Sequence, residues 1–96
     1  MAKVAFSSES LEDLERLTEF WIEKNPRWAE QTSLLIFEAV RALARHPYLG
    51  RQATSNIREL VISRGRTGYV ASYSLDEGSG DVVVLRIRHQ RERGLR

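Results

Sequence analysis

The last eleven residues of the chain hold the side chains best suited to chemistry. Residues 86–96 contain five arginines, one histidine and one glutamate, and they directly follow the β-type run at residues 82–85. Arginine guanidinium groups bind phosphates and carboxylates. The imidazole of His89 can exchange protons near neutral pH, so His89, Glu92 and Arg91 could provide general acid–base chemistry. Alternatively, His89 caps the last strand and Glu92 pairs with a neighbouring arginine.

A further cationic position lies earlier in the chain, at Arg58. Arg58 and Glu59 could form a cross-strand ion pair, or Arg58 could project toward the arginines of the last strand and enlarge a basic patch. Residues 1–50 carry six Lys/Arg and eight Asp/Glu, whereas residues 57–96 carry eight Arg and five Asp/Glu. A basic face suits nucleic acid or an acidic protein partner, although arginines also protect a strand edge against pairing.

Helical periodicity in the first half provides one layer of the scaffold. After a short strand at residues 3–7, Ser8 or Ser10 can cap a first helix, which Asn25-Pro26 ends. Its apolar stripe consists of Leu11, Leu14, Leu17, Trp21 and Ile22. A second stripe consists of Trp28, Ala29, Thr32, Ile36, Ala39, Val40 and Leu43. Because the connection is short, we expect an antiparallel helical hairpin with Trp21 and Trp28 in its seam.

Three strands follow, because the apolar periodicity changes to two. They cover residues 57–62, 69–75 and 82–88, and the glycine-rich segments between them are typical of hairpin connections. The element order β-α-α-β-β-β predicts an α+β domain, in which the N-terminal helical hairpin packs on a mainly antiparallel sheet. The N-terminal strand should join this sheet at an edge or beside the last strand.

Composition excludes several classes of function. A chain of 96 residues makes one domain, which we take to span residues 1–96. It has no cysteine, and His46 with His89 does not make a metal cluster, so we expect neither a metal nor another cofactor. No stretch approaches the roughly 20 apolar residues of a membrane span, and no signal peptide is visible. These features predict a cytoplasmic protein.

Several short features occur in a distinctive order and spacing. They are Leu11 with Leu14, the helix ending Leu43-x-x-x-Pro47-x-x-Gly50-Arg51, Arg58-Glu59, Gly68-Tyr69 through Tyr73, and Ile87-Arg88-His89-Gln90-Arg91. Their combination resembles the RelE/ParE family of bacterial toxin–antitoxin toxins over nearly the whole chain, and this resemblance implies the same element order. The helix ending and the His-x-Arg close of the last strand are more similar to the ParE branch than to the ribosome-dependent RelE ribonucleases.

The resemblance implies different chemistry for the two branches. Cutting RNA requires a base, an acid and cations around the phosphate. RelE ribonucleases commonly have a tyrosine near the C-terminus and an arginine after the Gly-Tyr of the middle strand. Here no tyrosine follows Tyr73, and Val70 stands after Tyr69. Should the chain be an mRNA endonuclease of this type, its catalytic candidates are His89, Glu92 and Arg91.

The ParE branch instead implies poisoning of DNA gyrase without hydrolysis by the toxin, with growth inhibition and plasmid stabilisation as consequences. The residues expected to contact this target are Arg58, Arg86, Arg88, His89 and Arg91. The family also implies a cognate antitoxin that lays a helix, and often a strand, over an apolar groove of the toxin to form a hetero-oligomer. Candidates for the groove, each of which could instead complete the core, are Leu34, Leu35, Phe37 and Leu49.

Overall fold

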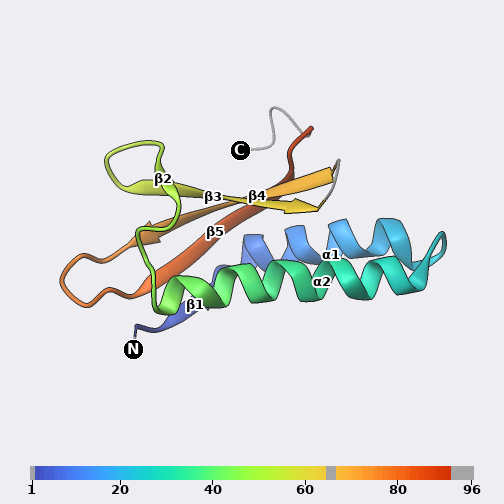
Figure 1. Cartoon of the computed structure of the whole chain (residues 1–96), viewed down its shortest axis with the longest axis horizontal. Helices are drawn as coiled ribbons and strands as arrows, with labels where there is room; N and C mark the ends of the chain where they lie inside the picture. The colour runs from blue at the N-terminus through green and yellow to red at the C-terminus, as the bar shows by residue number, and fades with distance from the viewer. Residues whose placement is uncertain (1, 65–66, 92–96) are drawn as a thin grey trace.

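Figure 1 shows the chain as a computed structural model, which describes residues 2–64 and 67–91. The elements are β1 (Val4–Phe6), α1 (Ser8–Ile22), α2 (Pro26–Arg41), the 3₁₀ turn η1 (Ala42–Ala44), β2 (Arg51–Gln52), β3 (Ile57–Arg64), β4 (Thr67–Leu75) and β5 (Val82–His89). The two helices lie side by side and cover one face of the sheet. Neither helix of the described ranges combines the length and the hydropathy that crossing a bilayer requires.

The sheet is mixed, with the strand order β1-β5-β4-β3-β2. Strands β3, β4 and β5 form the antiparallel meander that the sequence predicts, and β1 runs parallel to β5 at one edge. The predicted α+β class, a helical hairpin on a mainly antiparallel sheet, is confirmed. The sequence did not predict β2, because its two residues show no alternation and pair only with Arg58 and Glu59.

Each helix begins at a residue whose side chain caps the first turn. The N-cap of α1 is Ser7, not Ser8 or Ser10, and the Ser7 hydroxyl accepts a hydrogen bond from the Ser10 amide at 3.0 Å. Asn25 caps α2 by accepting from an amide of the first turn, and Pro26 follows where a missing N–H costs nothing. Ser7, Ser8 and Ser10 could each cap α1 by residue type. Ser7 is the N-cap because β1 ends at Phe6, directly before it.

The core lies between the hairpin and the sheet, and each large side chain buried there contributes about 1.5–3 kcal/mol. The largest fully buried apolar side chains are Tyr73, Ile36, Leu43, Ile87, Val40, Val82 and Val84. On α1 the prediction was partly wrong, because Leu11 and Ile22 are 48% and 52% exposed. They lie about 60–80° around the helix from Leu14, on the flank away from β5. On the opposite flank, Ser10 and Asp13 are buried.

A buried tyrosine holds the loop after η1 against the sheet. Tyr73 Oη donates a hydrogen bond to the Pro47 carbonyl at 2.7 Å and accepts one from the Gly50 amide at 2.9 Å. Arg58 Nε donates to the Gly50 carbonyl at 2.8 Å, and its guanidinium lies 5.2 Å from the centre of the Tyr48 ring. The segment between Pro47 and Gly50 is therefore anchored to β3 and β4 rather than forming a free surface turn.

Removing the Tyr73 hydroxyl should lower the free energy of unfolding by about 1–2 kcal/mol, because the Gly50 amide and the Pro47 carbonyl both lose their partner. Urea denaturation of Tyr73→Phe measures this loss. Tyr48→Phe is the matched control, since the Tyr48 side chain is largely exposed, and it should leave stability unchanged. Equal effects of the two substitutions would contradict the anchoring role of Tyr73.

Candidate functional site

Strand β5 carries most of the predicted site, and its register decides which face each side chain takes. Residues directly opposite each other on antiparallel strands share a face. His89 is opposite Tyr69, which is buried toward the helices, whereas Arg88 is opposite Val70 on the other face. Arg86 lies beyond the end of β1, where helix α1 runs along the edge of β5. The last strand therefore sends its charged residues in different directions.

Arg86 is bound by the buried carboxylate of Asp13. Asp13 Oδ2 accepts a hydrogen bond from Arg86 Nε at 2.8 Å, and Oδ1 accepts one from Nη2 at 3.0 Å. Oδ2 also accepts from the Ile87 amide at 2.9 Å, and the Ser7 hydroxyl donates to the Leu85 carbonyl at 2.9 Å. Side chains of Ser7 and Asp13, at and near the start of α1, therefore provide hydrogen-bond partners for the backbone of β5 beyond Val84, where its pairing with β1 ends. Arg86 acts here as a structural residue that joins α1 to the sheet.

Opposing effects act on the pKa of Asp13. Burial favours the neutral carboxyl and raises the pKa, but the hydrogen bonds from Arg86 and the Ile87 amide, together with the positive charge, outweigh burial, and Arg16 adds a weaker contribution. The pKa of Asp13 consequently lies below its ordinary value. The hydrogen bond to Asp13 raises the pKa of Arg86 in turn. Both partners are ionised at neutral pH.

Arg58 does not lie with the arginines of β5. It is opposite Tyr73 on the helix-facing side of the sheet, and its guanidinium donates to the carbonyls of Gly50 and Tyr48. Glu59 interacts with Arg51 at 3.5 Å, so this pair replaces the Arg58–Glu59 pair considered from the sequence. The structure accordingly does not bring Arg58 into a shared basic patch with the last strand.

His89 closes the end of β5. Its Nδ1 accepts a hydrogen bond from the Arg91 amide at 3.1 Å, and its ring meets Tyr69 edge to face at 5.4 Å. Arg88 Nη1 donates to the carbonyls of His89 and Gln90 at 3.5 and 3.4 Å. This geometry fits the strand-capping alternative for His89. Glu92 lies outside the described residues, so the His89–Glu92 acid–base pair stays a prediction.

The candidates for antitoxin binding differ in accessibility. Leu34, Phe37 and Leu49 are 51%, 39% and 55% exposed, whereas Leu35 is partly buried and packs against the core. The Phe37 ring also contacts Phe6 of β1 edge to face at 5.5 Å. Three of the four candidates therefore present apolar surface, and Leu35 contributes to the fold.

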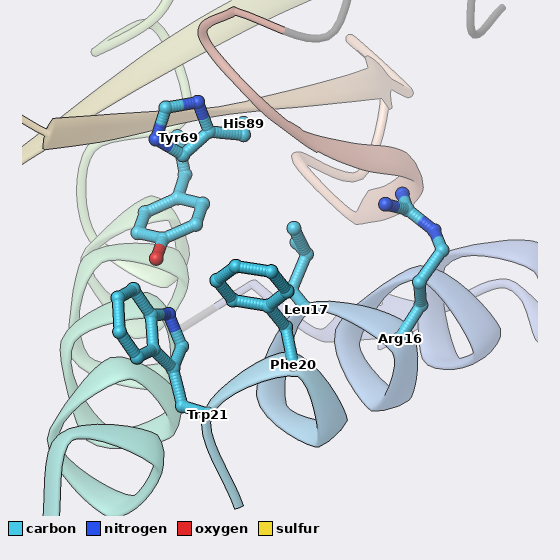
Figure 2. A pocket seen from close by; sticks show the side chains of 6 residues that line it. All are labelled: Arg16, Leu17, Phe20, Trp21, Tyr69 and His89. Carbon is cyan, nitrogen blue, oxygen red and sulfur yellow. The ribbon is translucent and has the colours of Figure 1, made fainter. Parts of the chain in front are cut away.

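A pocket that the sequence did not predict opens between the C-terminal half of α1 and the ends of β4 and β5 (Figure 2). Its volume is about 370 Å³, and its lining residues are Arg16, Leu17, Phe20, Trp21, Tyr69 and His89. The signal that could have indicated it is Phe20, a large aromatic residue between Leu17 and Trp21 that is 57% exposed.

In residues 2–64 and 67–91, His, Asp and Glu nowhere gather in groups of three that could hold a metal ion.

The helical hairpin on a mixed sheet, with an arginine-bearing last strand, defines a small toxin domain of the RelE/ParE superfamily. Residues 4–94 match the family described as the ParE toxin of the type II toxin–antitoxin system parDE, and the chain belongs to this family. It is 36% identical to toxin RelE3 of Caulobacter vibrioides, with 97% of this chain and 99% of that protein covered. Toxin RelE2 of the same organism is 34% identical, with 93% and 96% covered.

Two solved structures share the fold. A chain of the chromosomal ParDE toxin–antitoxin system from P. aeruginosa matches with a TM-score of 0.74 and 20% identity, covering 91% of this chain and 94% of that one. A chain of the toxin–antitoxin complex RelBE2 from Mycobacterium tuberculosis matches with a TM-score of 0.58 and 23% identity, covering 95% and 93%. At these identities the likeness concerns the arrangement of the elements.

Proposed function

We propose that this chain is a cytoplasmic toxin that stops growth by poisoning DNA gyrase and is neutralised by direct binding of a cognate antitoxin. The match to the ParE toxin family over residues 4–94 carries the proposal. ParE-like toxins, which the sequence resembles, are associated with gyrase inhibition in which the toxin hydrolyses nothing. The chemistry of the blocked cleavage reaction then belongs to the topoisomerase.

The placement of the cationic residues supports a contact role rather than catalysis. RNA cleavage needs an acid, a base and cations around one phosphate. Arg86 is bound by Asp13, Arg58 is bound by loop carbonyls, and His89 closes the strand end against Tyr69. Among the described residues of the site, Arg88 and Arg91 remain as the best candidates for contact with the target, because the Arg88 guanidinium meets backbone carbonyls of its own strand end at 3.4–3.5 Å and Arg91 is exposed.

The second candidate function is ribosome-dependent cleavage of mRNA. The observation that favours it is the name RelE carried by relatives that are 36% and 34% identical over nearly the whole chain. On this alternative His89, Glu92 and Arg91 take part in the reaction. The two functions predict different cellular responses, because only damage to DNA induces the SOS response.

Controlled expression of the wild-type chain in a bacterium should arrest growth, with filamentation and SOS induction. Arg88→Ala combined with Arg91→Ala should abolish this toxicity, because both guanidinium groups would contact the gyrase–DNA complex. Growth curves, cell length and an SOS reporter measure the response. Arrest with mRNA cleavage and no SOS induction would support the ribonuclease instead.

The matched control removes two positive charges elsewhere. Arg27 and Arg45 are exposed on the helical layer, so Arg27→Ala with Arg45→Ala changes net charge equally without touching β5. This variant should remain toxic. Thermal melting of both double variants separates loss of target contact from loss of folding, and unchanged toxicity of the Arg88/Arg91 variant would count against the proposed contact site.

A further inference from the structure

The exposed side of α2 carries four residues at regular spacing, Glu30, Leu34, Phe37 and Arg41. Their separations of four, three and four residues place the side chains in one stripe along the helix. Leu34 and Phe37 form its apolar centre and are 51% and 39% exposed, and an exposed charged residue stands at each end. Single exposed apolar residues are common on protein surfaces, but neighbouring ones in a stripe bounded by charges indicate a contact surface for another helix.

The charges at the two ends of the stripe are not neutralised within the fold. Glu30 and Arg41 form no ion pair with any residue in the described ranges. At the centre, the Phe37 ring meets the Phe6 ring of β1 edge to face at 5.5 Å, and this contact restrains its orientation before any partner binds. The stripe therefore offers a preorganised apolar surface with one negative and one positive end.

We infer that this stripe binds the same stripe of a second copy of the chain, with the two α2 helices antiparallel. A two-fold axis midway between Leu34 and Phe37 reverses the order of the stripe. Leu34 then packs on Phe37 of the second copy, and Glu30 meets Arg41 of the second copy. Symmetry repeats each pairing, so the interface contains two apolar contacts flanked by two ion pairs.

The charges disfavour the competing arrangements of two α2 helices. In a parallel pair, Glu30 would meet Glu30 and Arg41 would meet Arg41. An antiparallel register that places Leu34 on Leu34 would bring Glu30 opposite Glu38. The same register would bring Arg27 opposite Arg41. Like charges at such positions repel each other, whereas the register that pairs Glu30 with Arg41 avoids these conflicts.

The contact is small, because it involves one helix from each copy. Helix α2 has 16 residues and is about 24 Å long. An interface of this length lies at the low end of specific interfaces, so we expect a reversible dimer with a Kd on the order of 100 µM. The stripe includes no residue of β5, and self-association is therefore independent of the proposed contact with the target.

Sedimentation of the purified chain between about 10 µM and 1 mM tests the dimer. Leu34→Gln should raise its Kd at least about 10-fold, because the substituted residue occurs twice in the interface. Leu49→Gln is the matched control, since Leu49 is 55% exposed on the loop after η1, and it should leave the Kd unchanged. Thermal melting checks that both variants fold. A wild-type protein that stays monomeric throughout, or equal effects of the two substitutions, would overturn the inference.

Exchanging the charges tests the register. Glu30→Arg and Arg41→Glu should each raise the Kd about 3- to 10-fold, because each brings like charges together at both ends of the interface. An equimolar mixture of the two single variants should recover the wild-type Kd within about 2-fold, because both ion pairs form again between unlike copies. The double variant Glu30→Arg with Arg41→Glu should recover it as well. If neither sample recovers, the antiparallel pairing is wrong.

The antitoxin is the alternative occupant of the stripe. Loss of self-association in Leu34→Gln with undiminished binding of the antitoxin encoded beside the toxin gene would support the second copy. Weakened antitoxin binding with unchanged self-association would assign the stripe to the antitoxin and contradict the inference.

Discussion

Replacing Gly50 with alanine should lower the free energy of unfolding by about 2–4 kcal/mol, because the added methyl group has no space. A Cβ at this position would lie 2.7 Å from the Glu59 carbonyl oxygen and 2.8 Å from both Cε1 and the hydroxyl of Tyr73. The Glu59 oxygen belongs to the backbone of β3 and cannot turn aside. Moving Tyr73 would break its hydrogen bonds to Gly50 and Pro47. Equilibrium unfolding in urea measures the loss.

Gly78→Ala provides the control for this prediction. Gly78 lies in the exposed connection between β4 and β5, where the nearest atom to an added Cβ is Asp76 Oδ1 at 3.3 Å, on a side chain that can move. Its stability should stay within about 0.5 kcal/mol of wild type. A Gly50→Ala protein as stable as Gly78→Ala would show that the loop after η1 does not pack tightly against β3.

The apolar periodicities were sufficient to predict the two helices, the meander and their layering, because these depend on patterns within each element. The contacts that join elements far apart in the chain were not predictable in this way. Gly50 was recognised as part of a helix ending, but nothing within that motif indicates that Tyr73 and Arg58 surround it. The identity of such partners depends on the register between β3 and β4, which places Arg58 opposite Tyr73.

In the predicted site, too, the sequence indicates which residues are charged but not which residues from distant elements they contact. The run of arginines begins on the last strand, yet a run of residues cannot indicate which charges are neutralised within the fold. Arg86 and Arg88 are two residues apart, but Arg86 meets a carboxylate on α1 whereas Arg88 meets backbone carbonyls of its own strand end. The sequence alone does not indicate that Asp13 is buried, because its burial against β5 depends on the rotation of α1.

Asp13→Asn should be among the most destabilising single changes in the chain, lowering the free energy of unfolding at pH 7 by about 2–4 kcal/mol. The amide cannot accept from Arg86 and the Ile87 N–H as strongly as the carboxylate, and its NH₂ group meets other donors. The cost stays below that of a fully buried pair, because the Arg86 side chain is 37% exposed and water can replace part of the lost interaction. Glu12→Gln, which removes one charge from the exposed face of α1, should have little effect.

The pH dependence of this difference tests its electrostatic origin. Because the pKa of Asp13 is lowered in the folded state, the carboxylate's contribution is fully present above the ordinary value of 3.8 and is lost as the pH falls through the lower folded value. The stability gap between wild type and Asp13→Asn should therefore be constant near neutrality and narrow below about pH 4. Chemical denaturation across this range measures the gap. A gap that does not change in acid would mean that Asp13 acts through packing alone, and that α1 is joined to β5 without the charge of Arg86.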